Sequence, residues 1–256
     1  MSNTIAARLS ERPEKPFAPR LPWDRNFFLL LVLLIWLGTL VGFGWDVIHH
    51  IHANGRAYPL IVHVHAVVFV GWLALLTAQV LLVRVRRVDL HRRLGMVGIW
   101  LAAIMPVLGL AAAWVSERAK HGTAESDPSF LAIQITMMVC FPVLVAAAYR
   151  MRSQPPAHKR LMLLSTMYLS IAGFARWWFL AVGDVFGPGF ASLFVTLNLG
   201  GDVLIVALGA YDFLTRGRLH PAYVAGSLWI LASELFANWL YFNPTWGKVA
   251  AWLVGY

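Results

Sequence analysis

Long apolar stretches separated by short polar loops occupy most of the chain. Each stretch is close to the roughly 20 residues that a helix needs to cross about 30 Å of hydrocarbon. A soluble domain rarely carries even one such segment. The pattern therefore predicts seven membrane-spanning helices, at Phe27–Trp45, Pro59–Val83, Leu94–Val115, Phe130–Tyr149, Leu161–Val182, Pro188–Leu214 and Ala222–Phe242.

Little of the chain lies outside these stretches. Residues 1–26 form a polar arm whose four prolines recur at three-residue spacing, which predicts an extended, solvated segment. Residues 243–256 are too few to span and are expected to lie at the outer membrane interface. We therefore expect an all-α fold: one integral membrane bundle of seven transmembrane helices over residues 27–242, flanked by two short ends.

The basic residues are distributed unequally between the two sides of this predicted bundle. Sixteen Lys and Arg lie in the arm and in the loops after the second, fourth and sixth helices, whereas four lie on the opposite side. The positive-inside rule then places the N-terminus in the cytoplasm and the C-terminus in the periplasm. The net charge of +9 reflects this topology and attraction to anionic lipid headgroups. Membrane lipids are thus expected partners and nucleic acid is not.

Five histidines lie near the outer ends of the first two predicted helices, which a short loop joins. Imidazole binds haem iron, copper and zinc, and it seldom faces lipid. His63 and His65 are two residues apart on the second predicted helix, so their side chains point about 200° from each other and do not readily share one ion. The alternative is that the loop histidines are solvated and the helical ones hydrogen-bond across the bundle. The candidate metal ligands are His49, His50, His52, His63 and His65.

Three further histidines, His91, His158 and His220, begin the third, fifth and seventh predicted helices, each near basic residues. A histidine in this position can cap a helix, contact lipid phosphate or ligate a cofactor. Neighbouring Lys and Arg favour anionic groups such as phosphate or haem propionate. The candidate cofactor-binding residues are therefore His63, His65, His91 and His158, with lipid contact as the alternative for the last two.

Three charged residues fall inside apolar stretches: Arg176, Asp202 and Glu234. An isolated charge there costs about 2.5–3.5 kcal/mol or more, so such groups are expected to face inward and to pair. Arg176 and Asp202 are the favoured pair because they lie on consecutive helices. Glu234 then lacks an obvious basic partner. The set predicts either a proton or substrate path or an interhelical polar clamp.

Several motifs together resemble a group of uncharacterised bacterial multi-spanning membrane proteins. The resemblance supports the topology, a bacterial inner-membrane location and the choice of histidine sites. Membrane histidines on several helices are also similar, at the level of class, to transmembrane b-type cytochromes. The motifs are His63-Val64-His65-Ala66, Trp72, Gln79-Val80-Leu81-Leu82-Val83, LHRRLG at 90–95, HKRLMLLST at 158–166, Ala175-Arg176 and RLHPAY at 218–223.

The chain contains no Walker, dinucleotide-binding, nucleophile-elbow or HExxH motif, so no residue is singled out as catalytic and enzyme activity is left open. The leading hypothesis is a multi-pass inner-membrane protein with a histidine-ligated redox cofactor, haem b or copper, for electron transfer or redox-complex assembly. One alternative is a small proton-coupled transporter that uses Arg176, Asp202 and Glu234. The other is a non-catalytic accessory subunit of a larger membrane complex.

Overall fold

The computed structural model describes residues 17, 21–53, 57–182 and 185–256, and those that form regular structure are helical. This confirms the predicted all-α class. Most helices extend beyond the apolar stretches, because polar residues at the ends continue the helical hydrogen bonding. The long helices are α2 (Asp24–His52), α3 (Leu60–Arg84), α4 (Val88–Ala119), α5 (Leu131–Arg150), α6 (Pro155–Val182), α7 (Phe190–Arg216) and α8 (Pro221–Tyr241), and the short ones are η1 (Pro128–Phe130) and α9 (Pro244–Val254).

Five of the described segments are long and apolar enough to cross a membrane: α2, α3, α4, η1 with α5, and α7. They indicate a multi-pass membrane protein. The helices α6 and α8 fall outside this group because polar residues such as Ser165, Thr166, Glu234 and Asn238 interrupt their apolar sequence. These polar side chains are buried in the bundle. The sequence-based count of seven crossings thus remains a prediction for α6 and α8.

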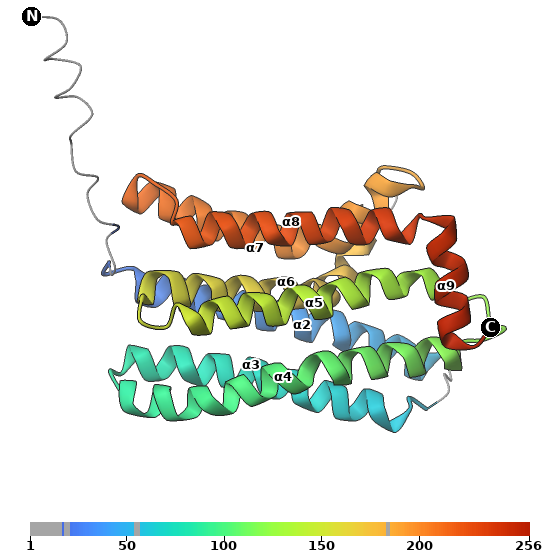
Figure 1. The fold of residues 1–256 in the computed structure, drawn as a ribbon, viewed down its shortest axis with the longest axis horizontal. Coiled ribbons are helices and arrows are strands. Elements are labelled where there is room, and N and C mark those ends of the chain that lie inside the picture. Colours follow the sequence, from blue (N-terminus) through green and yellow to red (C-terminus); the bar gives the residue numbers. More distant parts are fainter. Residues whose placement is uncertain (1–16, 18–20, 54–56, 183–184) are drawn as a thin grey trace, which may run out of the picture.

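The long helices lie side by side, and α6 occupies the middle of the bundle (Figure 1). It packs against α2, α5, α7 and α8, and its Leu164, Met167 and Tyr168 are almost completely buried. The helices α3 and α4 form a peripheral hairpin that packs chiefly within itself. Consequently α2 has its main partner in α6 rather than in α3, the next helix along the chain.

The close packing of α2 on α6 depends on glycine. A Cβ atom on Gly42 would lie 1.8 Å from the carbonyl oxygen of Gly173, and one on Gly38 would lie 2.3 Å from the Phe174 ring. Small residues at such crossings let helix backbones touch, which is how membrane helices gain dispersion energy without a hydrophobic driving force. This close approach of the two backbones holds α2 against the central helix α6.

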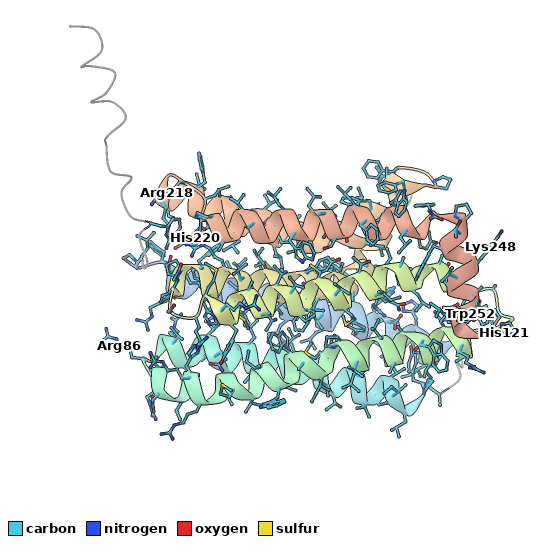
Figure 2. All side chains as sticks on the ribbon, viewed as in Figure 1. Arg86, His121, Arg218, His220, Lys248 and Trp252 are labelled. Atoms are coloured by element: carbon cyan, nitrogen blue, oxygen red, sulfur yellow. The ribbon has the colours of Figure 1, made fainter. Side chains whose placement is uncertain are left out.

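The end where α2, α4, α6 and α8 begin is called the basic end here. Arg86, Arg218 and His220 lie there, whereas His121 and Lys248 lie at the opposite end (Figure 2). The predicted tail forms α9, which lies across the opposite end of the bundle (Figure 1). Hydrogen bonds from the Trp114 and Trp246 indoles, to Leu253 O (2.8 Å) and Ser129 O (3.0 Å), fasten it there.

The predicted arm over residues 1–26 falls mostly outside the described residues. Its last part corrects the prediction, because α2 begins at Asp24 rather than Phe27. The reason is electrostatic: Asp24 is an acidic residue in the first helical turn, where the helix dipole favours negative charge, and basic side chains from other helices surround it.

Candidate functional site

Four inward-facing polar side chains lie at similar heights on α7 and α8, two on each helix. Asn198 and Asp202 are one turn apart on α7, and Glu234 and Asn238 are one turn apart on α8. Because the two helices are antiparallel, these pairs lie at matching heights, with Asp202 roughly 20 Å from either end of α7 at about 1.5 Å per residue. This group is called the α7–α8 polar site.

The carboxyl groups of Asp202 and Glu234 lie close enough to interact with each other. An ionised carboxylate can only accept hydrogen bonds, so the two groups can bond to each other only when at least one of them carries a proton. Among the described residues, neither carboxyl group has a Lys, Arg or His within ion-pair distance. No described basic side chain therefore compensates the charge of this pair.

Two oxygen atoms of the α7–α8 polar site are buried: Asn238 Oδ1, which has no partner among the described residues, and Glu234 Oε1, whose neighbouring polar group is the acid Asp202. Both side chains are almost fully enclosed, at 2% and 1% exposure. The amide of Asn238 donates to Glu234 O at 3.0 Å, which turns its carbonyl oxygen away from the helix backbone. An unpaired buried acceptor costs about 1–3 kcal/mol, so this oxygen is unusual in a purely structural contact.

The other titratable groups near this site are the Tyr168 hydroxyl of α6 and the Cys140 thiol of α5. Cys140 also interacts with Ser233, the residue before Glu234. The immediate surroundings of the carboxyl pair are thus neutral groups from the central and neighbouring helices.

The structure contradicts the pairing of Arg176 with Asp202. Arg176 Nε lies 3.5 Å from Asp46 Oδ2 of α2, and both side chains are partly exposed, at 36% and 46%. Its guanidinium also lies 4.1 Å from the centre of the Phe43 ring. The physical reason is length: the Arg side chain reaches outward along apolar surface and keeps its charge near water. The predicted network therefore reduces to Asp202 and Glu234.

A second buried polar centre, which the sequence reasoning missed, lies at the basic end. Arg160 of α6 binds Asp212 of α7 through two hydrogen bonds, and both side chains are fully buried. Arg216 lies 2.8 Å from both carboxylate oxygens of Asp24 and 3.3 Å from Asp212. Lys159 also reaches Asp24 at 2.8 Å. These five residues are called the basic-end ion cluster.

Residues around the basic-end ion cluster close it off. Tyr211 donates to Asp24 at 2.8 Å, and the Phe17 ring lies 4.7 Å from the Arg160 guanidinium and 5.1 Å from that of Arg216. Burial, and then the neighbouring Arg160, lower the pKa of the His220 imidazole. A neutral His220 accepts a hydrogen bond from the Ala222 amide at 3.1 Å and so caps α8. The sequence signal was the Asp212/Arg216 spacing of one helical turn.

The five predicted outer histidines do not converge on one point. His49, His50 and His52 lie in the last turns of α2 rather than in a loop. Their contacts differ: His49 bonds Trp45 O at 2.9 Å, whereas the rings of His50 and Tyr58 stack at 4.2 Å. Within the described residues, no three His, Cys, Asp or Glu side chains form a metal-binding group.

The two histidines of α3 also lie apart from one another. His63 is exposed and bonds Pro59 O at 3.3 Å. His65 packs on Phe69, with 4.0 Å between ring centres, and its Nδ1 is buried without a described partner. This divergence follows from their two-residue spacing on a helix.

The structure does bring together two predicted cofactor ligands, His91 of α4 and His158 of α6, with ring centres 6.3 Å apart. His158 Nδ1 bonds Ala148 O at 2.9 Å, and because a carbonyl oxygen only accepts hydrogen bonds, this ring nitrogen carries a proton. His91 Nδ1 and the nearby Gln79 Oε1 are buried and have no described partner. His91 and Gln79 thus carry buried polar atoms without a described partner, and the His91 ring lies beside that of His158.

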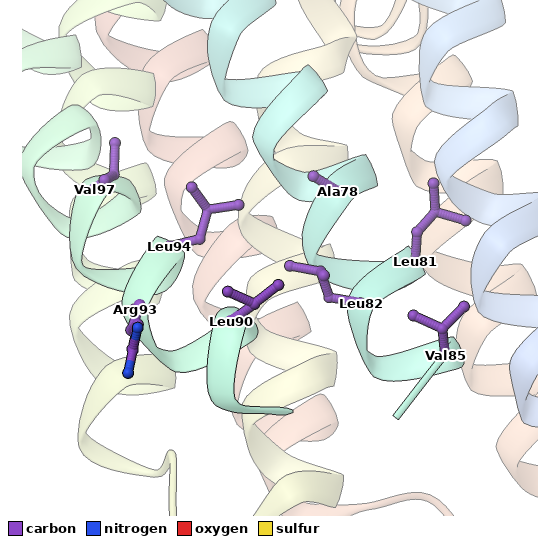
Figure 3. A pocket seen from close by; sticks show the side chains of 8 residues that line it. All are labelled: Ala78, Leu81, Leu82, Val85, Leu90, Arg93, Leu94 and Val97. Atoms are coloured by element: carbon purple, nitrogen blue, oxygen red, sulfur yellow. The ribbon is translucent and has the colours of Figure 1, made fainter. Parts of the chain in front are cut away.

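The surface of the bundle includes two grooves between neighbouring helices. The larger of the two, of about 670 Å³, runs between α3 and α4 near the basic end and is apolar except for Arg93 (Figure 3). The smaller, of about 270 Å³, lies between the start of α7 and the end of α8, and Ser192, Thr196 and Tyr241 line it.

Comparison of the chain with protein-family models, with curated proteins and with solved structures found no match.

Proposed function

We propose that this protein is a small proton-coupled carrier of the bacterial inner membrane, and that Asp202 and Glu234 hold the transferred proton. The observation that carries the proposal is that these two acids face each other between α7 and α8, with no described basic side chain within ion-pair distance of either. Carboxyl groups at membrane depth mark proton relays and ion pathways. Since no described basic side chain holds either carboxylate, the proton is the exchangeable partner.

The polar track on either side of the pair supports this assignment. Toward the opposite end, Asn238 and then Tyr241 follow Glu234 on one face of α8, and Tyr241 borders the smaller groove. Toward the basic end, the Tyr223 hydroxyl bonds Ile205 O at 2.9 Å. Polar groups thus continue from the carboxyl pair toward both ends of α8.

A proton-flux assay tests the proposed function. Proteoliposomes loaded with a pH-sensitive dye are given a pH gradient, and alkali cations, organic cations, organic acids and sugars are added in turn. We expect at least one class to drive proton movement, with a loss of tenfold or more in both Asp202→Asn and Glu234→Gln. His121→Ala, in a distant loop, is the matched control and keeps wild-type flux. Flux that persists in both carboxyl variants contradicts the proposal.

This function rests on a bundle of seven crossings with the basic end in the cytoplasm, which we propose from the distribution of Lys and Arg. Reporter fusions after Arg87 and Arg152 should report cytoplasm, and a fusion after Gly122 should report periplasm. The reverse result at any of these sites contradicts either the helix count or the orientation.

A second candidate, a single-ion redox cofactor held by His91, His158 and Gln79, is favoured by the paired rings and by the unpaired buried atoms beside them. Copper bound there would supply one-electron chemistry, and the Ala148 carbonyl would fix the orientation of His158. Metal analysis of protein purified without a histidine tag should find copper that His91→Ala and His158→Ala remove and His121→Ala keeps. Equal metal content in all variants contradicts this candidate.

A further inference from the structure

We infer that the α7–α8 polar site binds Na⁺ in exchange for the proton, so that an alkali cation is the solute that this carrier couples to proton movement. The inference rests on the proposed function and specifies its substrate. It begins from Asn238 Oδ1, a buried oxygen without a described partner, which belongs to a residue one turn from Glu234 on the same face of α8.

The donor set of this site is made of oxygen. Glu234 and Asp202 contribute carboxyl oxygens, and Asn238 contributes an amide carbonyl. Carboxylate and amide oxygens are the ligands of hard cations, whereas soft metals prefer sulfur and imidazole. Asn238 is important here because its side chain is uncharged and does not take up a proton. Protonation therefore cannot remove the cost of leaving its carbonyl oxygen without a hydrogen-bond partner.

Charge balance favours a monovalent cation. With a proton on each carboxyl group the site is neutral. When one proton leaves to water and Na⁺ enters, one carboxylate balances the cation and the site is neutral again. The exchange is therefore one proton for one cation, with no net charge left in the membrane interior. A divalent ion balances only if both protons leave, and Mg²⁺ and Ca²⁺ also call for six or more ligands.

The position of the site allows exchange with the aqueous phase. The smaller groove borders Thr196 of α7 and Tyr241 of α8, each about two turns from the carboxyl pair. Its polar rim faces the opposite end of the bundle from the basic-end ion cluster. A cation approaching from this side does not have to pass the buried arginines.

Na⁺ binding is tested by thermal unfolding of the full-length protein in detergent, in NaCl against choline chloride at equal ionic strength. At pH 8 we expect Na⁺ to raise the melting temperature in a saturable way, because a ligand that binds only the folded state stabilises it. At pH 5.5 the proton competes, and a tenfold or higher Na⁺ concentration should be needed. Tyr168→Phe and Cys140→Ser remove the other titratable groups facing the site and should keep this pattern.

Asn238→Leu should abolish the Na⁺ effect, whereas Asn238→Gln, which keeps a neutral amide oxygen on that face of the helix, should retain it. Ser233→Ala is the matched control, because Ser233 is buried on the same helix but bonds Trp229 O at 2.7 Å. The Gln variant keeps the test decisive if the Leu variant does not fold. A Na⁺ effect that is equal in Asn238→Leu and the wild type overturns the site, and so does stabilisation by Ca²⁺ but not Na⁺.

The two proposals fail in different ways. If proton flux needs Asp202 and Glu234 but another solute class drives it, the Na⁺ site is wrong and the carrier function stands. If no solute class drives flux that depends on these carboxyl groups, the carrier function is wrong.

Discussion

Helix α7 carries two inward-facing aspartates ten residues apart, Asp212 buried and Asp202 half-buried, and their surroundings differ in charge. Asp212 lies in the basic-end ion cluster, where Arg160 and Arg216 bind its carboxylate. Asp202 lies in the α7–α8 polar site, where its partner is another acid, Glu234. A guanidinium does not lose its proton in proteins, so the cations that bind Asp212 are permanent. Asp202 has no such cation beside it, and in the proposed function it shares with Glu234 a proton that can leave and return.

The largest effect is expected where fixed charges are broken. Asp212→Asn removes the carboxylate from Arg160, whose side chain is fully buried. Leaving such a charge uncompensated typically costs about 3–5 kcal/mol. The variant should melt at a much lower temperature in detergent. Arg87→Gln breaks the exposed Arg87–Asp89 pair and is the control, with no measurable change expected. Equal melting of the two variants would contradict the structural role of the cluster.

Replacing both partners tests whether the loss comes from the unpaired charge. The double variant Arg160→Met/Asp212→Leu leaves no orphaned ion between these two residues, and buried pairs replaced by apolar residues are often tolerated. We expect it to melt above Asp212→Asn and to recover half or more of the lost stability. A double variant that is less stable than either single one would mean that the ion pair itself, rather than charge balance, holds α6 to α7.

A substitution of the same kind at the exchangeable site should have a small effect on stability. Glu234→Gln replaces a group that shares a proton by a neutral amide of similar shape. We expect unfolding to change by less than about 1 kcal/mol, because no buried charge is orphaned. The comparison of its melting curve with that of Asp212→Asn is the measurement. A loss as large as that of Asp212→Asn would show that Glu234 is ionised and paired.

The smallest effect is expected at Arg176. Its contact with Asp46 is partly exposed and 3.5 Å long, so screening by water leaves it weak. Arg176→Gln should leave the melting temperature unchanged, and its effect should add to that of Asp202→Asn in a double-mutant cycle. If the two effects were not additive, the two side chains would interact, in agreement with the predicted Arg176–Asp202 pair and against the structure.

The helical class followed from hydropathy because apolar length alone requires helices in lipid. Glu234 was also recognisable as a carboxyl group without a basic partner. Its contact with Asp202 could not be predicted, because the position of a residue along a helix does not show which neighbouring helix that face packs against. The five residues of the basic-end ion cluster were hidden for a related reason. Lys159, Arg160 and Arg216 adjoin loops and counted as topology signals, and only packing shows that α2, α6 and α7 bring them to Asp24 and Asp212.

The histidines show the same limit in another form. The predicted convergence of five outer imidazoles relied on a loop that the protein builds as the last turns of α2. Extending the helix spreads His49, His50 and His52 around its surface, since neighbours on a helix point in different directions. By contrast, His91 and His158 stand at the starts of α4 and α6, and the common direction of those helices brings them to one level.

The contact of α2 with α6 also has a consequence for biogenesis. Helix α2 is synthesised first, yet its principal partner begins at Pro155, about 100 residues after α2 ends. At about 5–20 residues per second, α2 waits roughly 5–20 s for that partner. During this interval the Gly42 face is uncovered and Asp24 has none of its basic partners. Damage at this helix crossing should therefore appear not only as a lower melting temperature but also as nascent chains degraded in the cell before assembly is complete.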